Sequence, residues 1–221
     1  MKWSIEHRPS YSLLKVYLEP GESVTAEAGA MALMKGDIEV KTHTGGGLLK
    51  AFMRAIGGTE TLFLNTYTAR SRAEVWFVPS LPGDITAIEL RGDEWIVQDA
   101  SYLAHYGDID IGVAWRGLRG LLAEGELVWL RLSGRGIAWL SSFGAIERVD
   151  VGPGERVVID NFHFVAMPAG TRYNIRKFGG LKSFIFGGEG IVVEVEGPTT
   201  VYIQTRILPP FAYAIRRFVR K

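Results

Sequence analysis

The sequence predicts an all-β protein, and three observations support this fold class. Apolar and polar residues alternate with a period of two in short runs, including residues 62–67, 75–78 and 127–132, as is typical of half-buried strands. Glycine contributes 27 of the 221 residues, and Gly, Pro, Asp and Ser separate the runs, as expected where turns are frequent. The third observation is an internal repeat of β-rich segments.

Runs with the same pattern continue toward the C-terminus at 137–140, 191–195 and 201–204. β-branched and aromatic residues are frequent in all of them, and such residues pack well on a pleated, half-buried surface. A helical period is weak until the last residues of the chain. We therefore expect a sandwich or barrel of short strands.

The repeated segments open with similar turn sequences: Pro20-Gly21-Glu22, Pro82-Gly83-Asp84 and Pro153-Gly154-Glu155. Because proline followed by glycine is common in reverse turns, these triplets alone are weak support for a repeat. The first and third segments also align without a gap, so that Met31-Ala32-Leu33-Met34 falls on Phe164-Val165-Ala166-Met167. The gapless alignment is the stronger argument for a repeat.

A second shared element begins at Gly47, Gly117 and Gly180, which lie 27, 35 and 27 residues after the turn prolines. We therefore expect three tandem β repeats of roughly 65 residues, within residues 1–80, 81–144 and 145–206, followed by a basic tail at 207–221. One such unit buries little apolar surface, so the three are expected to pack as one body.

Composition excludes several classes of protein. Twenty-five basic and 24 acidic residues give a net charge of +1, which argues against a general nucleic-acid binder. The chain has no cysteine, which excludes disulfides, thiolate catalysis and cysteine zinc sites. No apolar run approaches the ~18 residues of a membrane helix, and the charged N-terminus does not resemble a signal peptide. We therefore expect a cytoplasmic protein.

Residues with catalytic or metal-binding potential do not form a recognisable site in the sequence. The histidines lie far apart, without a second ligand two to four residues away; they are His7, His43, His105 and His163. Residues 45–50 are glycine-rich and contain a lysine, but they lack the Gly-Lys-Ser/Thr ending of a phosphate loop. We predict no catalytic residue, metal site or cofactor, and expect that the protein is not an enzyme.

Longer motifs outside the triplets form a recognisable series. They are residues 58–67 before Pro79-Ser80-Leu81-Pro82-Gly83, residues 96–99 with Ser101-Tyr102-Leu103-Ala104, and residues 141–147. In this order they resemble the altered-inheritance-of-mitochondria biogenesis family, known in bacteria and archaea as a domain of unknown function. The resemblance covers about residues 3–206.

The resemblance implies a fold similar to that of the tryptophan RNA-binding attenuation protein, in which short double-stranded β-helix units stand side by side. It further implies that three units per chain and three chains, a homotrimer, form a ring of pseudo-ninefold symmetry. The mitochondrial members of the family imply a role in membrane organisation. The family offers no established catalytic residues to transfer to this sequence.

Two sequence features are candidate interaction surfaces, and the first is the element that begins at Gly47, Gly117 and Gly180. Lys50, Arg119 and Lys182 occupy matching positions in it. If a rotation relates the repeats, these cations lie on one rim beside apolar residues, a combination that suits an anionic membrane or a protein partner. The alternative is a connecting turn whose leucines enter the core and whose cations are merely solvated.

The second candidate surface is the tail after Pro209-Pro210. Four apolar residues fall on one stripe of a helix: Phe211, Ile215, Phe218 and Val219. Four cations lie mostly off this stripe: Arg216, Arg217, Arg220 and Lys221. Without these cations, 21 basic and 24 acidic residues remain. A helix of about 11 residues is marginal alone in water, so it needs an anionic membrane, a neighbouring subunit or the chain's own body.

The sequence therefore favours a non-enzymatic, ring-forming scaffold or binding protein that is associated with membrane organisation. Ring closure removes open strand edges, and a repeated binding element gains avidity. The alternative is RNA binding, by analogy with the attenuation-protein fold. The acidic body argues against this alternative, because RNA binding needs a positive track with stacking aromatic residues.

Overall fold

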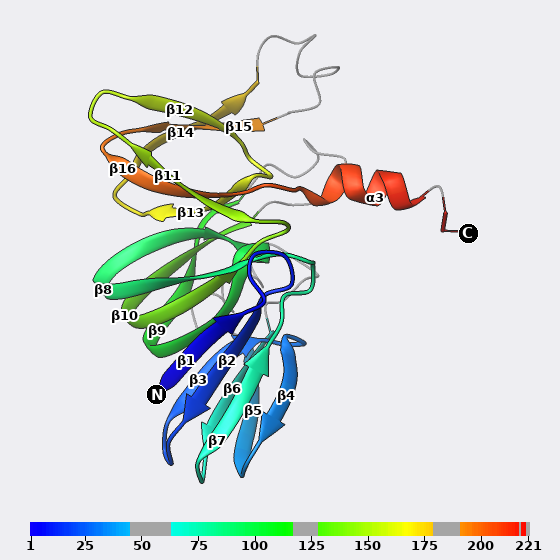
Figure 1. Cartoon of the computed structure of the whole chain (residues 1–221). Coiled ribbons are helices and arrows are strands. Elements are labelled where there is room, and N and C mark those ends of the chain that lie inside the picture. The colour runs from blue at the N-terminus through cyan, green and yellow to red at the C-terminus, as the bar shows by residue number, and fades with distance from the viewer. Residues whose placement is uncertain (45–62, 117–127, 179–190, 217, 220–221) are drawn as a thin grey trace.

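The structure, a computed structural model, describes residues 1–44, 63–116, 128–178, 191–216 and 218–219. It confirms the all-β class: the described chain is mostly strand, with one short C-terminal α-helix, α3 (Leu208–Arg216). A short C-terminal helix is therefore confirmed, but it ends at Arg216, so Phe218 and Val219 of the predicted apolar stripe lie beyond it. The strands form three consecutive groups, and Figure 1 shows them stacked in chain order from the bottom of the view to the top.

The first group of strands forms two separate sets of antiparallel pairs. In one set β2 pairs with β7 and β7 with β4, and in the other β3 pairs with β6 and β6 with β5. A further strand, β1 (Lys2–Glu6), pairs with β2. The six strands are β2 (Leu13–Leu18), β3 (Ser23–Glu27), β4 (Met31–Lys35), β5 (Ile38–Thr44), β6 (Phe63–Ala69) and β7 (Ala73–Phe77).

The third group follows the same order of pairing. Here β11 pairs with β16 and β16 with β13, while β12 pairs with β15 and β15 with β14. Each strand of this group therefore has the same partners as its counterpart in the first group. The strands are β11 (Ile146–Val151), β12 (Arg156–Asp160), β13 (Phe164–Pro168), β14 (Arg172–Lys177), β15 (Ile191–Glu196) and β16 (Thr199–Gln204).

The middle group contains three long strands, β8 (Ile85–Gln98), β9 (Tyr102–Arg116) and β10 (Val128–Ser141), and a 3-10 turn, η1 (Asp99–Ser101). The second half of β10 pairs with the first halves of β8 and β9, and the first half of β10 pairs with their second halves. When each long strand is divided at its centre, its halves pair like the six short strands of the other groups.

Because the middle strands are continuous, they join the groups into extended sheets. A nine-stranded sheet has the order β11-β16-β13-β8-β10-β9-β3-β6-β5. A four-stranded sheet, β1-β2-β7-β4, belongs to the first group, and a three-stranded sheet, β12-β15-β14, belongs to the third. The strands β4 and β12 thus lie at the ends of two separate sheets.

The turn glycines explain where the chain reverses. Gly21 and Gly154 have left-handed φ angles of +87° and +77°, which glycine adopts at little cost. In the middle group, Gly92 within β8 has a left-handed φ of +100° and is likewise followed by an acidic residue, Asp93. Gly83 instead forms a parallel bridge with Gly144, so the predicted reverse turn at Pro82-Gly83-Asp84 is wrong.

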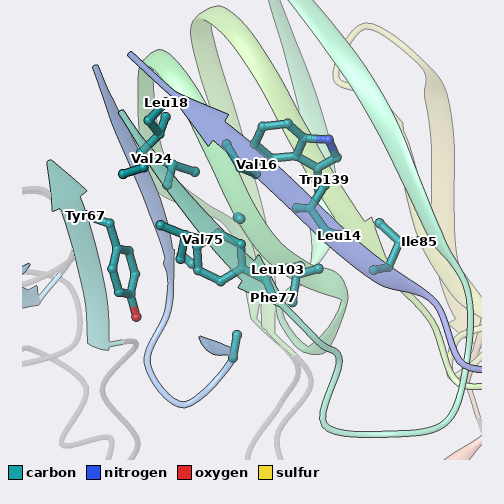
Figure 2. Close-up of a cluster of buried hydrophobic side chains, with 14 of the residues drawn as sticks. Leu14, Val16, Leu18, Val24, Tyr67, Val75, Phe77, Ile85, Leu103 and Trp139 are labelled. Carbon is teal, nitrogen blue, oxygen red and sulfur yellow. The ribbon is translucent and has the colours of Figure 1, made fainter. Parts of the chain in front are cut away.

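Three hydrophobic clusters hold the groups together, and each contains residues from more than one group. The cluster of the first group includes Leu103, Ala104 and Trp139 from the middle group, and Figure 2 shows Trp139 and Leu103 among strand residues of the first group. The cluster of the third group includes Ile96 and Trp129 from the middle group. The shared clusters show that the groups pack together, since burial of apolar surface is the main favourable term in folding.

Candidate assembly interface

Neighbouring groups are joined by two short antiparallel pairings. The first joins β3 to β9, and the second joins β8 to β13. In each contact, residues that follow a left-handed glycine, Gly21 or Gly92, pair with a strand of the next group. The paired residues are Thr25–His105 and Ala26–Ala104 in the first contact, and Trp95–Pro168, Ile96–Met167 and Val97–Ala166 in the second.

The two pairings have the same register when residues are counted from Gly21 in the first group, Gly92 in the middle group and Gly154 in the third. Ala26 and Val97 each lie five residues after the glycine of their group, and their partners Ala104 and Ala166 each lie twelve residues after the glycine of theirs. One rule therefore describes both contacts: the fifth residue of one group faces the twelfth residue of the next.

Two strands are left with a free edge at this position in the described chain. The twelfth residue of the first group is Leu33 in β4, and the fifth residue of the third group is Ile159 in β12. Strand β4 pairs with β7 on one side and ends its sheet, and β12 pairs with β15 on one side and ends its sheet. An edge strand presents unpaired N–H and C=O groups that can pair with another chain.

The burial of β4 differs sharply from that of its counterparts. The segments Tyr102–His105 and Phe164–Met167 are buried, whereas Met31–Met34 is exposed throughout. The exposed fraction is 38% for Leu33 and 46% for Met34, against 0% for Ala104 and 8% for His105. On β12, Val158 lies four residues after Gly154 and is 47% exposed. Its counterpart Ile96, four residues after Gly92, is 2% exposed. The two free edges therefore expose apolar residues that are covered elsewhere.

Two titratable side chains, the half-buried Glu27 and the buried His105, lie near the contact between β3 and β9. Burial raises the pKa of Glu27 to about 7, and the nearby carboxylate of Asp99 adds to this effect. Burial lowers the pKa of His105 to about 4, so the ring is neutral at pH 7. The His105 Nδ1 and the buried Tyr102 hydroxyl are 2.7 Å apart. Burial at this contact thus shifts the pKa of both groups in the direction that favours the neutral form.

The described chain offers little that resembles a metal site. Among residues 1–44, 63–116, 128–178, 191–216 and 218–219, no group of three or more His, Cys, Asp or Glu side chains is placed to hold a metal ion. His163, one of the four histidines considered from the sequence, has its Nδ1 2.6 Å from the carbonyl oxygen of Gln204. This hydrogen bond positions the ring against β16.

The rim predicted from Lys50, Arg119 and Lys182 lies outside the described residues. The strands on either side of each segment are described, and in every group they pair with each other. The terminal pairs are Thr44–Phe63, Arg116–Val128 and Lys177–Ile191. The three rim elements therefore occupy equivalent connections in the chain, each between two antiparallel strands.

The predicted tail surface lies partly within the described chain. Phe211, Ile215, Arg216 and Phe218 are all exposed, and Arg217 and Arg220 lie outside the described residues. The sequence prediction missed the edges of β4 and β12. A signal was available, because the exposed Met31–Met34 segment aligns with the buried Phe164–Met167 segment and is equally apolar.

Within the described residues, no helix is long and apolar enough to span a bilayer.

Comparison with known proteins places the chain among uncharacterised relatives. An uncharacterised protein of Streptococcus pyogenes serotype M6 is 26% identical over 227 residues, covering 99% of this chain and 91% of the relative. The crystal structure of another Streptococcus pyogenes protein superposes with a TM-score of 0.81 at 27% identity, covering 99% of both chains. The sequence pattern of the family described as mitochondrial biogenesis AIM24 matches residues 3–206. The chain therefore belongs to the mitochondrial biogenesis AIM24 family.

Proposed function

We propose that this protein is a non-enzymatic, cytoplasmic scaffold or binding protein that assembles head to tail into a ring of three chains. Each chain contributes three tandem repeats of one small β unit, of the double-stranded β-helix type expected from the attenuation-protein fold. The shared order of pairing in the three strand groups supports the repeat. A homotrimer then presents nine copies of the unit around one axis.

The single observation that supports assembly most strongly is the exposure of β4. The counterparts of this strand in β9 and β13 are buried against the preceding group, whereas β4 ends its sheet and no described strand covers its second edge. A strand of the same apolar character, with its edge and side chains exposed, is the surface that a preceding group would cover. The edge of β12 that no described strand pairs with is the complementary surface.

The proposed contact is an antiparallel pairing of β4 with β12 of a second copy. The rule that describes both internal contacts sets its register, with Leu33 opposite the partner's Ile159 and Met34 opposite the partner's Val158. Such an interface is heterologous, because each chain uses two different surfaces, and a heterologous interface forms a ring when its rotation closes. Three chains of three units close the ring if each unit is rotated by one ninth of a full turn from the one before it.

The experiment is a complementation test with two edge variants. Leu33→Lys/Met34→Lys places cations on β4, and Val158→Lys places one on β12. These side chains are exposed, so the fold of each chain should be retained, while lysine on an edge strand opposes pairing. Light scattering should give the mass of three chains for the wild type and of one chain for each variant alone.

A mixture of the two variants should form dimers, because one chain keeps an intact β4 edge and the other keeps an intact β12 edge. Val40→Lys on β5 is the matched control, since Val40 is exposed on a strand that ends a sheet but belongs to neither proposed edge. It should keep the mass of the wild type. A β4 variant that retains the wild-type mass, or a mixture that stays monomeric, would contradict the proposal.

RNA binding is the alternative function, by analogy with the fold of the tryptophan RNA-binding attenuation protein. The chain without its four C-terminal cations has more acidic than basic residues, which disfavours a continuous positive track for RNA. A gel-shift measurement with single-stranded RNA on the wild-type assembly decides between the two functions. We expect no shift at about 0.15 M salt; a shift that is lost in the monomeric edge variants would favour RNA binding by the ring.

A further inference from the structure

The C-terminal helix α3 stands apart from the strands. Figure 1 shows it projecting sideways from the stacked groups, with the C-terminus at its far end. None of its residues is buried. The ring of Phe211, near its start, packs edge-on against Phe143 with 5.1 Å between the ring centroids, which ties the first turn of the helix to the body.

Beyond this tie, the helix and the residues that follow it expose large apolar side chains. Tyr213 is 73% exposed and Phe218 is 84% exposed. The turn continues past the helix, because the N–H groups of Phe218 and Val219 donate to the carbonyl oxygen of Ile215. Further exposed apolar side chains belong to Leu208, Ile215 and Val219. Leaving this much apolar surface in water is unfavourable, so the segment favours an apolar surface outside its own chain.

The charge of the segment indicates what kind of surface that is. The chain has no acidic residue after Glu196, whereas Arg216, Arg217, Arg220 and Lys221 follow one another at the C-terminus. Arg216 at the end of α3 complements the helix dipole, but this role explains neither the other cations nor the exposed aromatic residues. Aromatic and aliphatic side chains interleaved with cations, without acids, are typical of helices that lie at an anionic lipid surface.

We propose that residues 208–221 dock on an anionic lipid bilayer, with Tyr213, Ile215 and Phe218 at the headgroup boundary and the C-terminal cations among the lipid phosphates. The body has an excess of acidic residues and is repelled by such a surface, so the tail is the part of the chain that approaches it. Three tails in one ring strengthen binding through avidity. The tail does not need the ring, since a single chain carries the same segment.

The experiment is flotation of the full chain with phosphatidylcholine vesicles that contain about one third phosphatidylserine. The wild type should float with these vesicles in about 0.1 M salt, and poorly with pure phosphatidylcholine vesicles or in about 0.5 M salt. Ile215→Ser/Phe218→Ser and Arg216→Glu/Arg217→Glu should each reduce the floated fraction about ten-fold. Tyr11→Ser, which removes an aromatic residue that is 74% exposed elsewhere, should float like the wild type.

Light scattering on a chain that ends at Arg206 separates this proposal from the assembly proposal. The truncated chain should keep the mass of the full-length protein and lose flotation. If the truncated chain falls to a smaller mass, the tail is a contact between subunits and the lipid proposal is overturned. Equal flotation of the wild type and both tail variants, or no flotation of the wild type, would also overturn it, whether or not the chain forms a ring.

Discussion

Glu27 shows how one residue can couple the stability of this fold to pH. Its carboxyl lies where β3 meets β9, and burial raises its pKa to about 7 from an ordinary value of 4.5. The protonated form is therefore favoured in the folded state. Its contribution to stability is complete below pH 4.5 and is lost as the pH rises through 7. Glu27 lies six residues after Gly21, and the residue six positions after Gly92 in the middle group is Gln98, which is neutral at every pH.

Glu27→Gln should therefore change the pH dependence of unfolding. We expect the stability of the variant relative to the wild type to increase between about pH 4.5 and 7, and to stay constant above pH 7. His105 loses its own stabilising contribution as the pH falls from 6.5 toward its folded pKa of about 4, but this effect is common to both proteins and cancels. Urea denaturation at pH 5, 6, 7 and 8 measures the difference. A difference that does not vary with pH would contradict this role.

Asp84 is a second residue whose hydrogen bonds and pKa allow a testable prediction about stability. It is buried between the first and middle groups, where Arg8 donates through Nε at 2.8 Å and through Nη2 at 2.9 Å, and Ser12 donates through Oγ at 2.9 Å. Burial raises the pKa of Asp84, but the hydrogen bonds from Arg8 and Ser12 outweigh it and the net pKa is lowered. Its stabilising contribution is thus present above pH 3.8 and lost as the pH falls below.

Asp84→Ala should cost about 2–4 kcal/mol of unfolding free energy at pH 7, since it leaves the buried Ser12 hydroxyl and the buried Ile85 N–H without their acceptor. Asp150→Ala is the matched control, because the ion pair of Asp150 with Arg148 at 2.9 Å is exposed on both sides, and exposed pairs contribute about 0–1 kcal/mol. Chemical denaturation at pH 7 measures both. Equal losses in the two variants would show that the Arg8–Asp84 contact is not a significant source of stability.

At the scale of elements, β10 is the strand that makes the middle group continuous. Gly134 lies at its centre with a left-handed φ of +122°, and a Cβ atom built on it would lie 2.1 Å from the backbone oxygen of Asp108 in β9. Neither the conformation nor the space accepts a side chain. The glycine therefore lets β10 pass from one set of pairs to the other while it keeps β9 as its neighbour.

Gly134→Ala should destabilise the chain by about 1–3 kcal/mol, because the backbone of β9 must move away from β10. Gly170→Ala is the control, since its Cβ would have no atom within 4 Å and its φ is not left-handed; it should change stability by less than about 0.5 kcal/mol. Thermal or urea unfolding measures both variants. A Gly134→Ala protein as stable as the Gly170→Ala protein would contradict the close approach.

At the scale of the whole molecule, the sequence pattern predicts the all-β class and the C-terminal helix, because alternation and the apolar stripe are local signals. The pattern does not locate the left-handed glycine of β8. Pro82-Gly83-Asp84 resembles the other two turn triplets in sequence, whereas Gly92 follows an arginine inside a continuous strand. Counted from Gly21, Gly92 and Gly154, the glycines Gly47, Gly117 and Gly180 lie 26, 25 and 26 residues away. The spacing is thus more regular than the triplets suggest.

The free edges could not be predicted for a different reason. The apolar segments Met31–Met34 and Phe164–Met167 carry the same pattern, and yet the first is exposed and the second is buried. An apolar pattern shows that a strand is suited to burial, but it does not show whether the covering group belongs to the same chain. The tail presents the same difficulty, since its stripe predicts a helix and leaves open what the helix contacts.

The most direct test of the head-to-tail assembly is a disulfide between the two edges. Met34 and the partner's Val158 are opposite each other in the proposed register, and opposite residues of antiparallel strands have Cα atoms about 4.5–5.5 Å apart, within the range of a disulfide. The chain has no cysteine of its own. Met34→Cys/Val158→Cys therefore reports on this contact alone when the oxidised protein is run on a non-reducing denaturing gel.

Closed assembly of three chains predicts covalent species of two and three chains that disappear on reduction, and none longer than three. The control Val40→Cys/Val158→Cys, which pairs β12 with the edge of β5, should remain a single chain. A Met34→Cys/Val158→Cys protein that stays monomeric after oxidation, or that cross-links no more than the control, would contradict the pairing of β4 with β12.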